Sequence, residues 1–250
     1  MADAEQVAEV LAWLERTGTK RNVEGMARYG IVAKKVFGVS VGELRTYAKG
    51  LGRSHALALR LWETEWYEAR MLAGFVDVPA EVTPAQMDAW ARDFDNWAIC
   101  DSTCFHLFDR TPHAWTKVER WAPKRDEFVR RAAFALIASL SVHDKRAPDA
   151  PYLRALELVE RYAIDDRNFV KKAVNWALRS VGKRNVALNA AAVEVARRLA
   201  HSEAAAPRWV GRDALRELTS EAVLTRLKAK AAKGPKAAKA AKASKATKAR

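Results

Sequence analysis

The sequence predicts an all-α fold. The chain has 250 residues, of which 50% are hydrophobic, and it contains only 11 glycines and 8 prolines. It is rich in alanine, leucine, arginine, lysine and glutamate, the residues that lose least free energy on entering a helix. Apolar residues recur at spacings of three and four along most of the chain, and no segment shows the strict alternation of an amphipathic strand. A chain of this length can bury a sizeable core in one or two domains.

Helix-start signals divide the N-terminal half into short helices. The segment 40–43, Ser-Val-Gly-Glu, has the spacing of a capping box, in which the serine and glutamate side chains satisfy free backbone N–H groups. Thr83-Pro84 places a capping residue before a proline at the first helical position. These signals and the apolar spacing predict helices that begin near Asp3, Met26, Ser40, Ser54, Glu65, Thr83 and Asp95.

The C-terminal half continues the same pattern. The segment 126–142 is long and mostly apolar, and the polar residues 143–148 that follow it predict a loop. The segment 186–200 is rich in alanine and predicts another helix, and Pro207 is expected to open the last one. Further helices are expected to begin at Thr111, before Leu153 and at Asn168.

A repeat indicates how these helices are arranged. Residues 127–133 (EFVRRAA) match residues 168–174 (NFVKKAV) at an offset of 41, and Trp97 and Trp66 align with Phe128 at weaker steps of 31. Helical pairs that repeat at roughly 40 residues are typical of HEAT-like solenoids, whose curved inner face binds extended partners. We therefore predict a HEAT-like helical-repeat solenoid, an α-α superhelix, with a concave basic face.

The repeat places four side chains of interest on one stripe. Counted from the aromatic residue that begins each repeat, Trp97 is at position 0, Asp101 at 4, Arg131 at 3 and Trp176 at 7. These offsets lie on one face of a helix, which would be the concave side of the solenoid. A carboxylate one turn from an indole is costly to bury in a core, because the charge loses its hydration. It is better suited to a solvated, aromatic-walled site for a cation.

Positive charge is concentrated at the C-terminus. The formal net charge is +14, and residues 228–250 hold nine cations and no acid, so the rest of the chain has a net charge of +5. We predict a repeat domain over residues 1–227 and a disordered Lys/Ala-rich basic tail over residues 228–250, since the tail has no large apolar residue. Both parts suit a polyanion, and the tail is expected to contact DNA non-specifically.

Other classes of protein and site find little support. The acidic N-terminus and the lack of long apolar runs predict neither a signal peptide nor a membrane span. Cys100 and Cys104 lie one turn apart and are expected to pack inward, which suits a reducing compartment. With His106 they lack a recognisable zinc spacing, so we expect no metal and no cofactor. We expect a monomer in the cytoplasm, associated with the nucleoid.

Four ordered segments resemble a known family. They are Met-Ala-Arg-Tyr at 26–29 with Gly38 and Arg45 after it, Asn-Trp-Ala-Ile-Cys-Asp at 96–101, Phe-Val-Arg-Arg-Ala-Ala at 128–133 and Phe-Val-Lys-Lys-Ala-Val-Asn-Trp at 169–176. Together they make the sequence similar to the AlkD-type DNA alkylation repair glycosylases, which are HEAT-like helical proteins. The resemblance spans roughly residues 20 to 180 and does not include the tail.

The resemblance implies a role for individual residues. Asp101 would be the catalytic carboxylate, and Trp97 and Trp176 would embrace the lesion nucleotide with Tyr29 nearby. Arg131 would contact the DNA backbone and the active site. The resemblance also places DNA contacts in the matched segments, at Arg45, Arg130, Lys171 and Lys172.

The expected function is therefore a monofunctional DNA glycosylase. It would hydrolyse the N-glycosidic bond of cationic purines alkylated at N3 or N7 in double-stranded DNA, with Asp101 stabilising an oxocarbenium-like sugar and positioning water. Two alternatives remain open. One is a non-catalytic HEAT-like protein that recognises DNA structure with the same face, and the other is a protein–protein scaffold, which would leave the basic tail unexplained.

Overall fold

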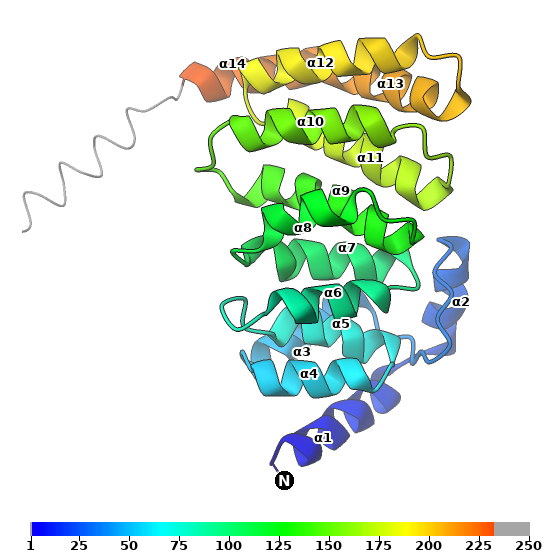
Figure 1. Cartoon of the computed structure of the whole chain (residues 1–250). Helices are drawn as coiled ribbons and strands as arrows, with labels where there is room; N and C mark the ends of the chain where they lie inside the picture. Colours follow the sequence, from blue (N-terminus) through cyan, green and yellow to red (C-terminus); the bar gives the residue numbers. More distant parts are fainter. Residues whose placement is uncertain (1, 233–250) are drawn as a thin grey trace, which may run out of the picture.

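The computed structural model describes residues 2–232, and within this range the chain is entirely helical, as predicted (Figure 1). No helix in this range is long and apolar enough to cross a membrane. The elements are α1 (Ala2–Thr17), α2 (Lys20–Arg28), α3 (Val41–Leu51), α4 (His55–Glu63), α5 (Tyr67–Val76), α6 (Pro84–Arg92), α7 (Trp97–His106), the 3-10 turn η1 (Phe108–Arg110), α8 (Ala114–Trp121), α9 (Glu127–His143), α10 (Ala150–Tyr162), α11 (Asn168–Gly182), α12 (Val186–Ala200), α13 (Ala205–Leu218) and α14 (Glu221–Ala232).

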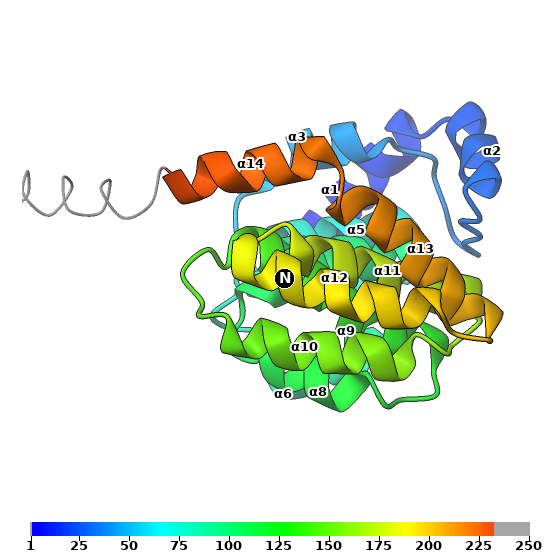
Figure 2. The same cartoon turned by 90° about the horizontal axis from the view of Figure 1, so that it is seen from above.

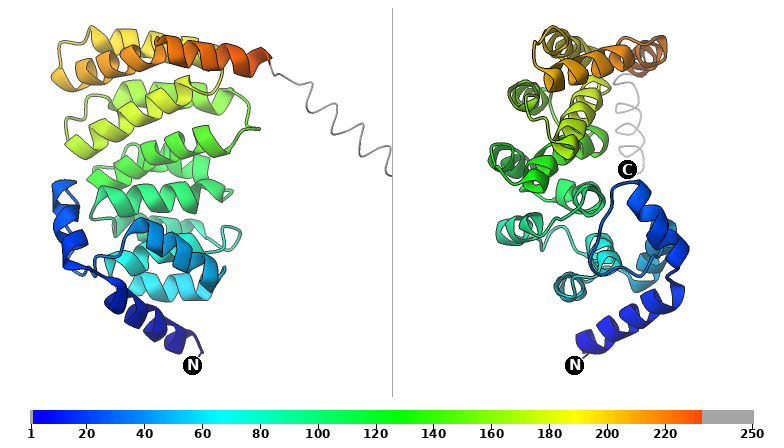
Figure 3. Two further views of the ribbon diagram at one scale, coloured as in Figure 1. Left: turned by 180° about the vertical axis from the view of Figure 1, so that it is seen from behind. Right: turned by 90° about the vertical axis from the view of Figure 1, so that its right-hand side faces the viewer.

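The helices stack in two layers that form a curved solenoid. Helices α4, α6, α8, α10 and α12 form the outer layer, and α5, α7, α9, α11 and α13 form the inner layer (Figure 2). Seen along the helices, in the right-hand view of Figure 3, the molecule is C-shaped. The blue segment that contains α2 lies beside one end of the opening, and α13 and α14 lie at the other. The concave channel therefore runs nearly parallel to the helix axes. This architecture confirms the predicted HEAT-like solenoid.

The repeat found in the sequence corresponds to the starts of the inner helices. Trp66 is the N-cap residue of α5, Trp97 is the first residue of α7, and Phe128 and Phe169 are the second residues of α9 and α11. Because the inner helices pack side by side, the same turn of each helix reaches the same edge of the layer. Side chains at equivalent positions are thereby brought together from separate repeats.

A buried carboxylate fixes the segment before α3. Glu68 on α5 is fully buried and accepts hydrogen bonds from the backbone N–H groups of Phe37, Gly38 and Val39 at 3.0, 2.6 and 3.2 Å. Gly38 has a φ of +86°, and a Cβ atom there would lie 2.3 Å from the carbonyl oxygen of Thr19. Helix α2 has no buried residue of its own. Its position over the channel therefore depends on contacts at its two ends.

The two cysteines pack between α7 and α9, as expected. Both cysteines are buried and form no disulfide, and their sulfur atoms lie 3.6 and 3.7 Å from carbonyl oxygens of α9. Burial, with the neighbouring Cys100 thiol and nearby carboxylates, raises the pKa of the Cys104 thiol well above its usual value. A neutral thiol is suited to this apolar interface.

The C-terminal boundaries differ from the prediction. Helix α14 is not predicted by the sequence pattern, and it continues through residues 228–232, which the prediction places in the disordered tail. Val223 and Leu227 are buried and anchor this helix, and Lys230 donates to the carbonyl oxygen of Arg184. The rest of the predicted tail, residues 233–250, lies outside the described residues. Pro207 falls inside the first turn of α13, and so does not open the last helix.

Two further starts are displaced. A helix is predicted to begin near Met26, but α2 begins at Lys20 after the N-cap residue Thr19, so Met26 lies near its end. Thr111 is predicted to begin a helix, but it follows η1, and α8 begins at Ala114. The hydroxyl of Thr111 donates to the carbonyl oxygen of Phe108 at 2.8 Å, so it closes the preceding turn. Side-chain hydrogen bonds of this kind compete with helix capping.

Two glycine substitutions test how the position of α2 is fixed. Gly38→Ala should lower the free energy of unfolding by about 1 to 3 kcal/mol, because it combines a positive φ with a clash against backbone. Urea titration followed by circular dichroism measures the change. The matched control is Gly25→Ala inside α2, where an added Cβ meets nothing within 4 Å. A Gly38→Ala protein as stable as this control would contradict the proposed strain.

Candidate active site

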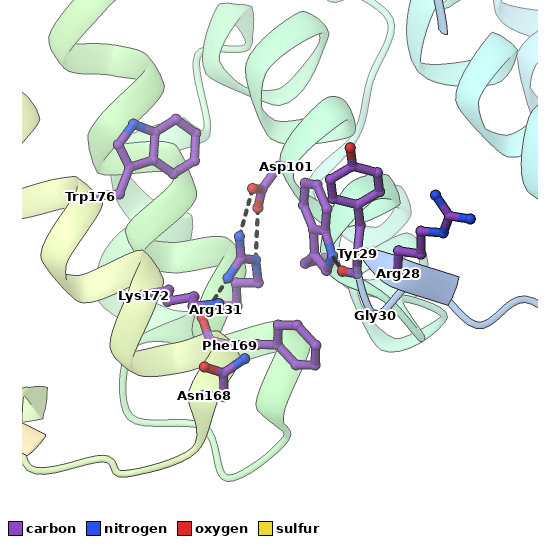
Figure 4. A pocket seen from close by; sticks show the side chains of 10 residues that line it. Arg28, Tyr29, Gly30, Asp101, Arg131, Asn168, Phe169, Lys172 and Trp176 are labelled. Atoms are coloured by element: carbon purple, nitrogen blue, oxygen red, sulfur yellow. Dashed lines mark hydrogen bonds and ion pairs between the residues drawn. The ribbon is translucent and has the colours of Figure 1, made fainter. Parts of the chain in front are cut away.

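A cavity of about 630 Å³ opens where the first turns of α7, α9 and α11 meet the end of α2. The side chain of Asn96 accepts hydrogen bonds from the N–H groups of Ala98 and Ile99, and this cap begins α7 at Trp97. Asp101 is thereby held one turn inside the helix, on the side facing α9. The lining residues are Arg28, Tyr29, Gly30, Trp97, Asp101, Arg131, Asn168, Phe169, Lys172 and Trp176 (Figure 4).

A bidentate ion pair between Arg131 and Asp101 lies in the cavity. Arg131 donates from Nε to Oδ1 of Asp101 at 2.8 Å and from Nη2 to Oδ2 at 2.6 Å. Its remaining Nη1 donates to the carbonyl oxygen of Phe169 at 2.5 Å. The pair therefore joins α7 to α9, and the third bond joins both to α11. Planar pairing of this kind fixes the orientation of both side chains.

Burial and pairing have opposite effects on the Asp101 carboxyl. The side chain of Arg131 is only 7% exposed and that of Asp101 19%. Burial raises the pKa of Asp101, while the charge and hydrogen bonds of Arg131 act in the other direction. The pKa of Arg131 is raised, because its own desolvation is outweighed by the attraction of Asp101. Both carboxyl oxygens accept N–H groups, which is the bonding pattern of an ionised carboxylate.

Aromatic rings flank the carboxylate. In Figure 4 the carboxylate of Asp101 lies between the rings of Trp176 and Tyr29. The indole N–H of Trp97 donates to the carbonyl oxygen of Tyr29 at 2.9 Å, so this bond also attaches the end of α2 to α7. Tyr29 is 71% exposed and the two indoles are half-buried. The site is therefore an open, aromatic-walled cleft at the surface of the solenoid.

The cleft combines one paired carboxylate with unneutralised cations. Arg28 and Lys172 lie at its rim, and neither forms an ion pair within the described part of the chain. The lining therefore has a net positive charge, which suits an anionic backbone. The electron-rich indole faces suit a cation placed beside the carboxylate. Within residues 2–232 no three histidine, cysteine, aspartate or glutamate side chains are grouped as metal ligands.

The structure brings most of the predicted site residues together. Trp97, Asp101, Arg131 and Trp176, which the repeat places on one stripe, all line the cavity, as do Tyr29 and Lys172.

Three predicted DNA contacts lie elsewhere. Arg130 pairs with Asp165 at 2.6 Å and Lys171 lies 5.1 Å from the ring centre of Trp209, while Arg45 lines a separate cavity. Their roles on DNA stay predictions.

Four lining residues are not predicted by the sequence pattern. They are Arg28, Gly30, Asn168 and Phe169. Phe169 serves in the sequence only as a repeat marker, yet its carbonyl oxygen holds Arg131 and its ring lies 5.5 Å from that of Phe128. Gly30 adopts a φ of +69°, and its place in the cleft depends on how α2 crosses the channel. No local pattern reveals such a long-range contact.

Two comparisons with known proteins gave a match. A family model described as "DNA alkylation repair enzyme" matches residues 10–218. A solved structure described as "a new family of proteins related to the HEAT-like repeat DNA glycosylases with affinity for branched DNA structures" is similar with a TM-score of 0.68. It is 24% identical in sequence, and the similarity covers 76% of this chain and 81% of the other. A search of curated proteins gave no match.

The role of Arg131 can be tested through the titration of Asp101. Arg131→Gln should raise the pKa of the Asp101 carboxyl further, because burial is retained and the opposing charge is removed. NMR observation of the carboxyl carbon measures this pKa directly. Arg130→Gln, which breaks the neighbouring pair with Asp165, is the matched control and should leave the Asp101 titration in place. Identical Asp101 titrations in all three proteins would contradict the pairing.

The same variant should show a defined pH dependence of stability. A carboxyl whose pKa is higher in the folded than in the unfolded protein loses stabilisation as the pH rises through that interval. The free energy of unfolding of Arg131→Gln should therefore be only slightly below that of the parent chain in acid. The difference between the two should grow as the pH rises. At neutral pH we expect about 2 to 4 kcal/mol, since the carboxylate is partly exposed to water. Urea titrations at several pH values measure it.

Proposed function

The chain belongs to the DNA alkylation repair enzyme family, and we propose that it is a DNA glycosylase that releases cationic alkylated purines from double-stranded DNA. The observation that supports this most strongly is the Asp101–Arg131 pair set between aromatic rings in an open, positively charged cleft. A purine alkylated at N3 or N7 bears a positive charge and is already a good leaving group. The enzyme therefore has to supply only part of the reduction in the barrier.

The aromatic side chains would recognise the charge of the damaged base. An indole face attracts a cation by roughly 0.5 to 2 kcal/mol, with the larger values in desolvated sites. Trp97 and Trp176 are both half-buried and line the same cavity as the carboxylate. Tyr29 adds a third ring at the open side. We propose that these rings hold the lesion nucleotide beside Asp101.

Asp101 would act on the sugar. Positive charge moves from the base onto the deoxyribose as the glycosidic bond breaks, and a carboxylate beside C1′ stabilises this oxocarbenium-like state. Each carboxylate oxygen of Asp101 uses one acceptor position on Arg131 and keeps another. The free positions can orient a water molecule and take its proton as it attacks C1′. The products would be the free alkylated base and an abasic site.

Arg131 would be a positioning residue. Its two bonds to Asp101 fix the carboxylate plane, and its charge favours the ionised form. Asp101 and Phe169 accept three of its five N–H groups, so the other two can face a DNA phosphate. Arg28 and Lys172 would contact the backbone from the rim of the cleft. The proposed partner is duplex DNA, bound by a monomer in the cytoplasm.

A non-catalytic function is the second candidate. The similar solved structure is described as having affinity for branched DNA, and this chain shares its fold. A protein of that kind would use the channel to recognise the shape of branched DNA. It would not need an ionised carboxylate between aromatic rings. Assays that measure base release and binding to branched DNA on the same preparation separate the two functions.

Asp101→Asn tests the chemical step. The amide keeps the size of the carboxylate but removes its charge, so single-turnover release of methylated purines should fall by at least about 100-fold. The assay incubates protein with methylated duplex DNA and measures released bases by chromatography. Asp166→Asn is the matched control, because Asp166 is an exposed carboxylate near the start of α11 that does not line the cleft. No base release by the parent chain, with preferential binding to branched DNA, would favour the second candidate.

The C-terminal segment is proposed to be a non-specific DNA tether. Deleting residues 233–250 removes seven cations and leaves α14 intact. The slope of log affinity for unmodified duplex against log salt should become shallower, by about 0.9 for each phosphate that the segment neutralises. Fluorescence anisotropy over a range of salt concentrations measures this slope. An unchanged slope would contradict the tether, and loss of the chemical step at saturating protein would place the segment in the reaction.

A further inference from the structure

A second cavity, of about 470 Å³, lies at the opposite end of the inner helices from the first. It is formed by α3, the loop that follows it, the end of α5 and the turn η1 after α7. Four of its seven lining residues are cations, and all four are exposed. The cations are Arg45, Lys49, Arg53 and Arg110, and the other lining residues are Ala48, Gly52 and Phe75.

Two neighbouring carboxylates, those of Asp77 and Asp109, are each bonded to a histidine. Asp77 is buried, and its Oδ1 lies 2.6 Å from Nδ1 of His55. Asp109 is also buried, and its Oδ2 lies 2.5 Å from Nδ1 of His143. Arg53 donates one N–H group to the carbonyl oxygen of Asp77 at 2.5 Å. The cavity therefore contains a surplus of positive charge that these acids do not neutralise.

The remaining three cations are available to a ligand. Arg45 and Lys49 are one turn apart on α3 and so share a face. Neither pairs with an acid within 4.0 Å in the part of the chain that the structure describes. Arg110 reaches Asp109 only at 4.0 Å, and its side chain is 44% exposed. Three charged groups with free N–H donors thus border one hollow.

A neighbouring histidine responds to this charge. His106, the last residue of α7, has its pKa lowered to about 4, first by burial and then by Arg45, Arg110, His143 and Arg53. Three of these four neighbours belong to the cavity. The positive potential of cations on α3, its following loop and η1 therefore converges at one point.

Helix α7 relates this cavity to the first one. Trp97 at its start lines the cleft, and His106 is at its end. The ring centre of His106 lies 5.0 Å from that of Phe75, which lines the second cavity. His106 follows Trp97 by nine residues. At a rise of about 1.5 Å per residue this is roughly 13 Å. The concave channel runs nearly parallel to the helices (Figure 3). A duplex in the channel, with a rise of about 3.4 Å per step, would pass the second cavity about four base-pair steps from the cleft.

We propose that the cavity of Arg45, Lys49, Arg53 and Arg110, the phosphate cradle, binds backbone phosphates of DNA on one side of the lesion. The proposal rests on the proposed function only in requiring that DNA occupies the concave channel. Guanidinium groups match the geometry of phosphate oxygens, and such contacts fix the register of a protein on a duplex. The cradle would thus hold the duplex so that the damaged nucleotide lies at the cleft.

The salt dependence of binding tests the charge of the cradle. In the full-length chain, Lys49→Ala combined with Arg110→Ala removes two cations from the cavity. The slope of log affinity for unmodified duplex against log salt should become shallower by about 1.8, if each cation neutralises one phosphate. The matched control is Arg154→Ala combined with Arg161→Ala, which removes two exposed cations from α10 in the outer layer. Equal slopes for the two double variants would overturn the proposal.

Neutral linkages test the position of the cradle. Single methylphosphonates are placed at successive steps around one 7-methylguanine, and binding is measured in an Asp101→Asn background so that the base stays attached. Binding should weaken when the neutral linkage lies about four steps away on one side only. The Lys49→Ala, Arg110→Ala pair should make binding insensitive to that linkage. Equal sensitivity with and without the pair would overturn the assignment of this phosphate to the cradle.

The two proposals fail in different ways. A parent chain that releases no base, yet shows the difference in salt slope on unmodified duplex, would refute the glycosylase and retain the cradle. A chain that releases base, with equal slopes in the two double variants, would refute the cradle and retain the glycosylase.

Discussion

The Asp101–Arg131 pair is the constraint on which the site depends. The buried guanidinium and the largely buried carboxylate require each other, because either one alone would lose hydration without compensation. The bonded groups come from different repeats: α7 supplies Asp101, α9 supplies Arg131 and α11 supplies the carbonyl oxygen of Phe169. The packing of three repeats is thereby coupled to the orientation of one carboxylate. Any shift between inner helices would misplace the charge that the proposed reaction needs.

The fold and the centre of the site could be predicted from the sequence for the same reason. Helix-start residues and the repeat are local signals, and a solenoid brings equivalent turns to one edge, so the register alone places Trp97, Asp101, Arg131 and Trp176 together. The path of α2 could not be predicted in this way. It depends on the buried carboxylate of Glu68 and on a single hydrogen bond from Trp97, both of which join residues about 30 or more positions apart. Helix α14 has only two buried anchors, Val223 and Leu227, and the Lys/Ala-rich sequence that follows them from residue 228 does not continue their apolar pattern.

Neighbouring cations in the repeat motif have different environments because helical residues are rotated by about 100°. Arg131 faces the cleft, whereas Arg130 faces the outer layer, where it donates to the carbonyl oxygen of Ala122 and lies over the ring of Tyr162. In the next repeat Lys172 lines the cleft, while Lys171 lies over the ring of Trp209 on the neighbouring inner helix α13. Basic pairs in a helical motif therefore cannot be assigned to DNA as units. One member stabilises the packing of repeats, and the other is available to a ligand.

The openness of the cleft limits how the proposed enzyme could select its substrate. Tyr29 is 71% exposed and the lining offers few neutral hydrogen-bonding side chains, of which Asn168 is one, so the edges of a base would be read poorly. The rings and the carboxylate respond instead to positive charge, which alkylation places on the base and bond cleavage then transfers to the sugar. An unmodified purine has neither the charge to attract the indoles nor the ability to leave unprotonated. Selectivity would thus arise from the chemistry of the lesion, while contacts along the backbone would supply the affinity and the register.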